Sequence, residues 1–552
     1  MNLGGIETRE KLKGDFKMKK RLKKIMAITL IIAFLMSLTA CIGKLDLGSD
    51  EEAEEVTSQP EIEVKPEEYG IQLEAYDSLE HGEATEAATE LMLNSFREYM
   101  EEALADPVRQ KEVTPERTKI KGGFNDYLNV CTIEADGKKM RYTMEIIGEP
   151  EENGLYPLYI TLHGGGESSE AENNGEWMTM TNYYRDSVTN GIYVAVRGME
   201  DVWNMHFIED AFPMYDRLIE DMILLKKADP NRVYLLGFSA GGDGVYGVAP
   251  RMADRFAAVN MSSGHPNGIS LLNVSNLPFE IQVGIRDYYT ESAARSVRGA
   301  EFESVLNEYN EIFGCEYPHR VLVHVPEGHN YNDSFTLDDD VREQISEEEL
   351  ALYETYVLKD PAQFAARAEE ENWLGKFLEI YESVGGNGSV MDLSYDSPAG
   401  LDEKIFECVT NDLNMEVTNE EDCNAVHYVS SFTRDPVPSG FIWDFSTRAP
   451  KRKNEAFYWL KADYSVDHGM VHALYDWEEN IVYLETEDLN GEITILANPF
   501  LMDFDRPLGI VTGAGEMTVD LNADPDTVKR AISETGDLYL SWADEIKVTV
   551  GE

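Results

Sequence analysis

The chain has 552 residues, with 47 lysines and arginines against 104 aspartates and glutamates, and its formal net charge is −57. A surface this acidic repels the phosphates of nucleic acids, so the composition argues against DNA or RNA as a partner. The length exceeds what one modest hydrophobic core needs, and we therefore expect two folded domains.

The first 40 residues predict a secretory signal peptide. Basic residues between 17 and 24 precede an apolar run over 25–38, which is shorter than a membrane-spanning helix needs. The run ends at Leu38-Thr39-Ala40-Cys41, which resembles the lipobox of bacterial lipoproteins and implies cleavage before Cys41 and lipidation of its thiol. The alternatives are an ordinary signal peptide with an incidental cysteine, or an uncleaved anchor. The start codon is also open, because Met18 lies in the basic region and could replace Met1.

Residues 41–70 predict an acidic tether. Aspartate and glutamate dominate this segment, which has almost no large apolar side chains. Low hydrophobicity combined with high charge cannot offset the entropy of the chain, so we expect disorder here. The sequence thus predicts an extracytoplasmic protein that is held to the cell membrane by a lipid at Cys41.

Residues 71–390 predict an α/β domain that opens with an amphipathic helix at 85–105. Strands and helices then alternate, which indicates a doubly wound, mostly parallel sheet with helices on both faces. The strands are expected at 140–147, 156–162, 191–196, 232–236, 256–261, 279–283 and 320–325, and the helices at 214–227, 240–252 and 299–313.

The turn after the strand at 232–236 reads Gly237-Phe238-Ser239-Ala240-Gly241, and a helical stretch follows it. On a strained turn between a strand and a helix, only small neighbours avoid a clash, and the serine hydroxyl projects from the edge of the sheet. This pattern predicts that Ser239 is a catalytic nucleophile.

A second glycine-rich turn, His163-Gly164-Gly165-Gly166, follows the strand at 156–162. Glycines let the backbone approach a substrate closely, so an amide of this turn and the amide of Ala240 are expected to donate hydrogen bonds to a tetrahedral oxyanion. Gly165 is the favoured donor, and Gly164 is the next candidate.

The rest of a catalytic triad is expected from the chain order serine, acid, histidine, with each residue directly after a strand. Asp287 follows the strand at 279–283, and His329 follows the strand at 320–325. The imidazole would take the proton of the serine, whose unassisted hydroxyl is a poor nucleophile, and the aspartate would fix the tautomer of the imidazole.

Other residues compete for these roles. His324 and Glu280 lie inside strands, where packing is the simpler explanation, and Asp243 lies one turn into a helix, where it complements the helix dipole. His265 follows a strand but precedes the acid, which breaks the chain order. The residues that could instead line the substrate pocket are His163, Trp203, His206 and His265.

The C-terminal part is expected to be a linker over 391–424 and a β-rich accessory domain over 425–552. Strands are predicted at 456–460, 480–485, 492–496, 538–542 and 547–550, with Leu489-Asn490-Gly491 as a hairpin turn. Four tryptophans fall in this part, and core packing is a better explanation for them than binding of sugars: Trp443, Trp459, Trp477 and Trp542.

Four cysteines follow Cys41, and none has the spacing of metal ligands, so no metal is expected. An extracytoplasmic location permits disulfides, and Cys408 with Cys423 is the most plausible pair by spacing. The other two are Cys131 and Cys315.

From about residue 137 to 335 the chain resembles bacterial α/β-hydrolases of the polyhydroxybutyrate depolymerase and feruloyl esterase type, and also the prolyl oligopeptidase-like hydrolases. The run from Asp229-Pro230-Asn231-Arg232 to the second glycine of the serine turn, Gly242, is typical of these groups. The resemblance implies an α/β-hydrolase catalytic domain, and ester hydrolysis without a metal or cofactor. It also implies an ester substrate such as an acylated polysaccharide or a polyester. Two departures count against a polymer: a triple glycine stands where secreted depolymerases commonly carry a cysteine beside the oxyanion glycines, and the C-terminal domain has no recognisable binding motif.

The sequence therefore predicts a membrane-tethered serine hydrolase that cleaves carboxylic esters through an acyl-enzyme on Ser239. The first alternative is a serine peptidase of the prolyl oligopeptidase type, since the same triad serves both reactions. An ester is favoured because no segment ahead of the hydrolase has the pattern of a β-propeller. A third hypothesis, from another class, is a surface-binding lipoprotein with a retired active site.

Overall fold

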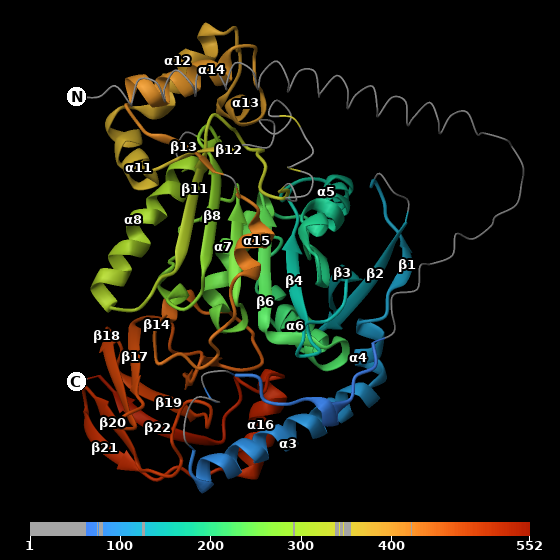
Figure 1. Cartoon of the computed structure of the whole chain (residues 1–552), viewed down its shortest axis with the longest axis vertical. Helices are drawn as coiled ribbons and strands as arrows, with labels where there is room; N and C mark the ends of the chain where they lie inside the picture. The colour runs from blue at the N-terminus through green and yellow to red at the C-terminus, as the bar shows by residue number, and fades with distance from the viewer. Residues whose placement is uncertain are drawn as a thin grey trace, which may run out of the picture.

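The computed structural model describes residues 62–73, 76, 81–123, 127–290, 293–336, 342, 346, 355–420 and 422–551 (Figure 1). The predicted signal peptide, Cys41 and the tether up to residue 61 lie outside these residues. Within the described part, no helix is both long enough and apolar enough to cross a membrane.

The end of the predicted tether is part of the folded structure. Residues 62–70 contain a 3-10 turn at Pro66–Glu68, and the Tyr69 side chain is buried, with its ring centroid 5.0 Å from that of Phe96. Phe96 belongs to the long helix α3 (Glu83–Ala105), where the helix at 85–105 was expected. Burial of the Tyr69 ring against Phe96 stabilises this segment in spite of the charged residues around it. The folded part therefore begins before residue 71.

The centre of the molecule is a sheet of eleven strands in the order β1-β2-β3-β5-β4-β6-β7-β8-β11-β12-β13. The strands from β5 to β11 in this order are parallel to one another, and β3 is antiparallel to β5. This is the α/β-hydrolase arrangement, and it confirms the predicted fold class. The bounds are β1 Glu116–Lys119, β2 Tyr127–Ala135, β3 Lys138–Ile147, β4 Tyr156–Leu162, β5 Gly191–Arg197, β6 Ala228–Phe238, β7 Ala258–Ser262, β8 Phe279–Gly284, β11 His319–His324, β12 Thr355–Leu358 and β13 Val417–Glu420.

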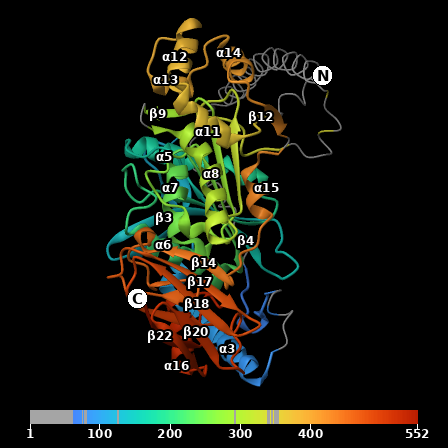
Figure 2. The same cartoon turned by 90° about the vertical axis from the view of Figure 1, so that its left-hand side faces the viewer.

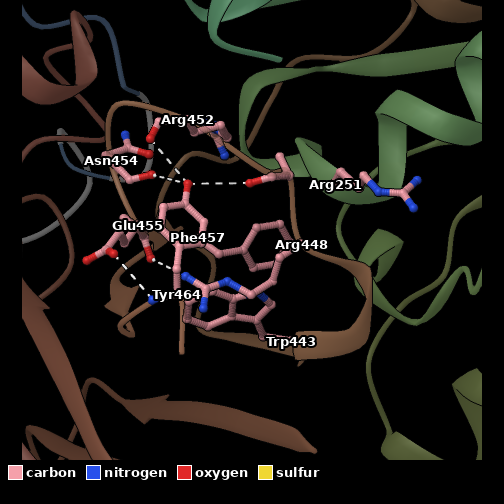
Figure 3. Close-up of a pocket in the computed structure, with 10 residues that line it drawn as sticks. Arg251, Trp443, Arg448, Arg452, Asn454, Glu455, Phe457 and Tyr464 are labelled. Carbon is pink, nitrogen blue, oxygen red and sulfur yellow. Dashed lines mark hydrogen bonds between the residues drawn. The ribbon is translucent and has the colours of Figure 1, made fainter. Parts of the chain in front are cut away.

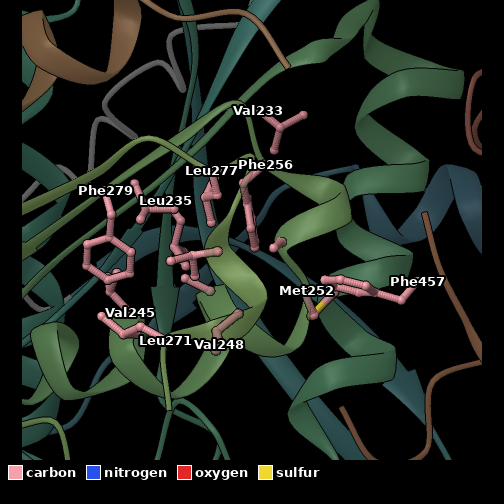
Figure 4. Packing of buried hydrophobic residues seen from close by; sticks show 14 of the residues in the cluster. Val233, Leu235, Val245, Val248, Met252, Phe256, Leu271, Leu277, Phe279 and Phe457 are labelled. Carbon is pink, nitrogen blue, oxygen red and sulfur yellow. The ribbon is translucent and has the colours of Figure 1, made fainter. Parts of the chain in front are cut away.

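Helices cover both faces of this sheet. Successive residues of a strand point to opposite faces, so apolar strands give each face its own hydrophobic cluster. Leu235 of β6 belongs to the hydrophobic cluster that includes α6 (Ala211–Lys226), α7 (Ala240–Val248) and α8 (Arg295–Phe313). Its neighbour Leu236 belongs to the cluster on the other face, with Trp177 and Val426 from the helices α5 (Glu170–Tyr183) and α15 (Ala425–Ser430). Figure 4 shows the first cluster packed around α7.

A helical segment connects β12 to β13 and lies beyond the carboxyl ends of the parallel strands, at the top of Figure 1. Its helices are α11 (Pro361–Glu370), α12 (Trp373–Ser383), α13 (Val390–Tyr395) and α14 (Leu401–Glu407), followed by a π-helical turn at Cys408–Asp412. The linker expected over 391–424 is thus made of regular structure, and β13 within it pairs with β12 in the large sheet.

The C-terminal part forms two further sheets and the helix α16 (Pro525–Thr535), at the opposite end from α11–α14 in both Figure 1 and Figure 2. The first sheet has the order β14 (Gly440–Asp444), β17 (Met470–Asp476), β18 (Ile481–Glu487), β20 (Leu508–Thr512) and β21 (Gly515–Val519). The second has the order β15 (Ala456–Phe457), β16 (Leu460–Lys461), β19 (Gly491–Ala497) and β22 (Asp544–Val550).

Two sequence-based expectations for this part are wrong. The turn at Leu489-Asn490-Gly491 does not join a hairpin, because β18 and β19 belong to different sheets, and the chain passes from one sheet to the other there. Residues 538–542 form a buried turn instead of a strand, with Trp542 fully buried.

The C-terminal sheets are packed tightly on the base of the large sheet, where the parallel strands begin. The Arg434 guanidinium donates to Asn231 Oδ1, close to the start of β6, and forms an ion pair of 2.8 Å with Asp537. Figure 3 shows a small pocket in which the Arg448 guanidinium lies over the rings of Trp443 and Tyr464. Its volume of about 10 Å³ is filled by one water molecule at most.

Candidate active site

Ser239 occupies a strained turn between β6 and α7. Its backbone has φ 58° and ψ −121°, a region that side chains other than glycine avoid. Glycines on either side make the turn possible: a Cβ at Gly241 would overlap the carbonyl oxygen of Leu162, and one at Gly237 would overlap the carbonyl oxygen of Gly241. The turn directs the serine side chain out of the carboxyl edge of the sheet.

His329 connects Ser239 to Asp287. The distance from His329 Nε2 to Ser239 Oγ is 2.9 Å, and the distance from His329 Nδ1 to Asp287 Oδ2 is 2.8 Å. The side chains of Asp287 and His329 are buried, and both residues follow parallel strands, β8 and β11. The three residues that the sequence predicts for a triad therefore form one hydrogen-bonded chain.

The helix α13 holds this arrangement from outside. The His329 amide donates to the carbonyl oxygen of Ser394 at 2.7 Å, and the Ser394 hydroxyl donates to Asp287 Oδ1 at 3.3 Å. On the other side, the Ser263 hydroxyl donates to the carbonyl oxygen of His329 at 2.8 Å. Both the acid and the base thus have their positions fixed by neighbouring segments.

A buried arginine lies beside the acid and the base. Arg295 Nη1, at the start of α8, is 3.4 Å from Asp287 Oδ1 and 3.4 Å from His329 Nδ1. Burial alone would raise the pKa of Asp287, but the charge that His329 carries when it is protonated, the charge of Arg295 and the hydrogen bonds from both residues lower that pKa below its ordinary value. Asp287 therefore remains a carboxylate over the whole neutral range.

The triple glycine forms a loop directly over the serine. A Cβ at Gly164 would lie 3.4 Å from Ser239 Cβ, so the loop approaches the nucleophile closely. Gly165 has φ 101°, and the Gly166 amide donates to Asn173 Oδ1 at 3.0 Å. Among the described residues, the amides of Gly164, Gly165 and Ala240 have no acceptor of their own, which leaves them available to a substrate oxygen. Sequence reasoning did not find Asn173, which fixes the loop.

Two of the predicted pocket histidines lie beneath this loop. His163 Nε2 accepts from the Gly198 amide at 3.0 Å, so its Nδ1 carries the proton and donates to the carbonyl oxygen of Gly164 at 2.6 Å. His206 Nε2 lies 2.9 Å from the carbonyl oxygen of His163. Burial lowers the pKa of both imidazoles, to about 4 for His206, so both are neutral. They support the loop from behind.

The other two pocket candidates differ from each other. Trp203 lies next to the loop, with its Cα 3.8 Å from the position of a Cβ at Gly166, and its side chain is 50% exposed. The His265 ring contacts Asn267, and its amide donates to Asp243 Oδ1 at 2.6 Å. No hydrogen bond joins His265 to the triad within the described chain.

The competitors for the acid and base roles have other partners. Glu280 is buried and pairs with the Arg320 guanidinium, whose Nε lies 2.7 Å from Glu280 Oε1. His324 Nε2 lies 2.9 Å from Gln282 Oε1, and its ring stacks on that of Tyr331. Neither Glu280 nor Asp243 contacts the imidazole of His329.

The described residues hold no cluster of three or more histidine, cysteine, aspartate or glutamate side chains that could bind a metal ion. The four described cysteines are all free and buried, so the expected pair of Cys408 with Cys423 is wrong. Cys423 packs with Leu322 and Val357 in a small apolar cluster instead. Spacing along the chain does not reveal this, because Cys408 lies in the π-helical turn after α14 whereas Cys423 follows β13 of the large sheet.

No protein-family model and no curated protein matches the sequence. Solved structures that match part of the chain include a thermostable esterase (18% identity, 35% of this chain and 53% of that chain, TM-score 0.27). A ferulic acid esterase matches at 15% identity over 36% of this chain and 90% of that chain, with a TM-score of 0.26. An S-formylglutathione hydrolase from Agrobacterium tumefaciens matches at 13% identity over 39% of this chain and 92% of that chain, with a TM-score of 0.28. The chain thus spans about half the length of the thermostable esterase. Identities and TM-scores this low do not argue a function, which has to come from the site itself.

Proposed function

We propose that the protein is a serine hydrolase that cleaves carboxylic esters. The observation that carries this proposal is the hydrogen-bonded chain from Ser239 Oγ through both nitrogens of His329 to Asp287. Distances of 2.8–2.9 Å are the lengths expected for the hydrogen bonds that join a nucleophile to its general base and the base to the carboxylate that orients it.

The reaction follows from this geometry. Ser239 Oγ attacks the ester carbonyl while His329 Nε2 takes its proton, and the imidazolium that forms is stabilised by Asp287. The amides of Gly164, Gly165 and Ala240 are the candidate donors to the oxyanion, where one donor contributes about 3–4 kcal/mol in the transition state. His329 then returns the proton to the leaving alcohol, and a water molecule activated by the same imidazole releases the acid from Ser239.

The place of the reaction is a second part of the proposal. The basic and apolar run before Cys41 supports export and lipidation, and we propose that the enzyme works outside the cytoplasm on a lipid tether. Cys41→Ser should then move the protein from the membrane fraction to a soluble or unprocessed form. Unchanged membrane association of that variant would contradict the anchor.

The activity is tested with the mature chain and three substrate sets: short acyl esters, feruloyl and acetylated sugars, and peptide amides. Ester turnover is expected, and a serine-reactive fluorophosphonate should label Ser239. Ser239→Ala should lose both turnover and labelling while the thermal melt stays close to that of the wild type, since the hydroxyl contributes little packing. Labelling of another serine would overturn the assignment, and turnover of peptide amides alone would favour the peptidase.

A further inference from the structure

An acidic side chain lies beside the nucleophile and has no part in the triad. Glu176 extends from α5 along the glycine loop, with its Cγ 3.6 Å from the position of a Cβ at Gly165. Its Oε2 is 3.2 Å from the position of a Cβ at Gly164, and that same point is 3.4 Å from Ser239 Cβ. The carboxylate is therefore within reach of a substrate bound to Ser239.

Glu176 differs from the other acidic residues of its helix. Glu170 forms an ion pair of 3.1 Å with Lys121, and Glu172 closes a capping box with Ser169. The Glu176 carboxylate has neither a hydrogen bond nor an ion pair with any other described residue. The Glu176 side chain is exposed to solvent, and its pKa is raised by partial desolvation of the carboxyl and lowered by the charge of a protonated His329, which places the carboxyl in the electrostatic field of the triad.

A negative charge at this position opposes the reaction that we propose. The oxyanion of the tetrahedral intermediate would form close to Glu176, and two like charges near each other raise the barrier. A positive charge on the substrate would remove this cost and would supply the ion-pair partner that the carboxylate lacks.

Two exposed aromatic side chains lie near the site. The backbone of Trp203 lies next to Gly166 of the glycine loop and its side chain is 50% exposed; Tyr395 of α13 is 55% exposed, with its ring centroid 5.0 Å from that of His329. The faces of such rings attract cations, most strongly when the cation loses part of its hydration. A carboxylate together with exposed aromatic rings suits a quaternary or substituted ammonium group.

We propose that Glu176 is a specificity-determining residue, and that it selects esters carrying a positively charged group close to the reacting carbonyl. This inference rests on the proposed ester hydrolysis.

The test compares cationic esters with neutral esters of the same shape. One pair varies the alcohol (butyrylcholine against 3,3-dimethylbutyl butyrate), and the other varies the acyl group (the p-nitrophenyl esters of 4-(trimethylammonio)butyrate and 5,5-dimethylhexanoate). The wild type should show a kcat/KM about tenfold higher for the cationic member of at least one pair, as expected for one partly desolvated charge contact. Glu176→Gln should bring that ratio close to one. Glu170→Gln makes the same change of charge on the same helix and should leave the ratio at its wild-type value.

A second measurement does not depend on ester turnover. Tetramethylammonium should slow the fluorophosphonate labelling of Ser239 in the wild type, tert-butanol should not, and Glu176→Gln should remove the protection. A wild type that prefers neither member of either pair and shows no protection would overturn the role of Glu176 while leaving ester hydrolysis intact. The role of Glu176 would also be overturned, with ester hydrolysis intact, if Glu176→Gln kept the wild-type preference for the cationic ester. A Ser239 that neither turns over esters nor reacts with the phosphonate would overturn both proposals.

Discussion

Each residue of the proposed triad depends on neighbours that hold one specific atom in place. Asp287 uses Oδ2 for His329, while its Oδ1 receives the Ser394 hydroxyl and faces Arg295. Three potential donors thus face the carboxylate, and the imidazole donates to it from Nδ1. The orientation of the base is therefore built into the resting site.

Asp287→Asn should lower kcat by about four orders of magnitude and change KM much less. An amide in this place stabilises the wrong imidazole tautomer, and the imidazolium that the carboxylate supports forms only during the reaction. Steady-state kinetics on a short acyl ester, with a thermal melt as a check of folding, measures the effect.

The matched control is Asp243→Asn, because Asp243 is partly buried near the site but bonds to His265 and Asn267. It should retain turnover within about tenfold of the wild type, since Asp243 forms no hydrogen bond with the imidazole. A larger loss for Asp243→Asn than for Asp287→Asn would show that the acid is misassigned.

At the scale of elements, the site depends on close contact between β4, the serine turn and α7. The contact is possible because the helix begins with glycines, and Gly241 packs directly on the carbonyl oxygen of Leu162 at the end of β4. The same contact fixes the distance between the glycine loop and Ser239, so packing and catalysis depend on the same atoms.

Gly241→Ala should destabilise the fold by about 1–3 kcal/mol, the range for overpacking a tight contact. Turnover should fall by about a hundredfold as well, since a shift of about 1 Å misplaces the nucleophile. Urea unfolding and ester kinetics measure the two effects.

Gly175→Ala provides the control for this substitution. Gly175 lies in α5 with nothing within 4 Å of an added Cβ, and the change should stabilise the helix by about 0.5–1 kcal/mol. Equal stability of Gly241→Ala and the wild type would contradict the packing argument.

A buried histidine in β11 makes the stability of the sheet dependent on pH. Burial and the charge of Arg320 lower the pKa of His324 to about 3, whereas an unfolded histidine has a pKa near 6.5. Between these two values the unfolded chain binds a proton that the folded chain does not, so the free energy of unfolding decreases as the pH falls below about 6.5.

His324→Gln should reduce this pH dependence by up to about 1.4 kcal/mol per pH unit between pH 6 and 4. Urea midpoints of the variant and the wild type at several pH values give the slopes. His468→Gln is the control, because the His468 side chain is 79% exposed. If the free energy of unfolding of both variants depends on pH as steeply as that of the wild type, His324 is protonated in the folded state.

The elements that could be predicted from sequence are those whose pattern is local. Apolar runs marked the parallel strands, and the small residues around Ser239 and after His163 marked the two functional turns. Arg295, Ser394 and Glu176 escaped prediction because each is an ordinary polar residue in a helix, and only the tertiary packing brings it to the site. The hairpin expected at residues 489–491 failed for a related reason: an Asn-Gly pair favours a turn but does not choose the partner strand.

At the scale of the whole molecule, the C-terminal sheets and the part built on the large sheet share one hydrophobic core, to which Phe457 and Leu235 both belong. Buried ion pairs also connect the two parts. Arg452 pairs with Asp216 of α6 at 2.8 Å and with Asp254 at 3.1 Å, and its side chain is almost inaccessible to solvent. The two parts should therefore unfold together.

Arg452→Met should destabilise the protein by about 3–5 kcal/mol, because it leaves a buried carboxylate without a partner. Tryptophan fluorescence and loss of ester turnover should change at one urea concentration in the wild type. Lys451→Met is the control: Lys451 is half exposed beside Asp210, and surface pairs contribute about 1 kcal/mol or less. Separate transitions in the wild type would show that the parts fold independently.

The first described residues remain at the base of the molecule. The Gln72 amide donates to the Tyr539 hydroxyl at 2.6 Å, and the Asp505 carboxylate caps the start of α3. Ser239 lies at the far end of the large sheet, so a lipid at Cys41 would turn the base toward the bilayer and the mouth of the site toward the surroundings. Such an orientation favours esters carried by the cell wall or the medium over the lipids of the cell's own membrane.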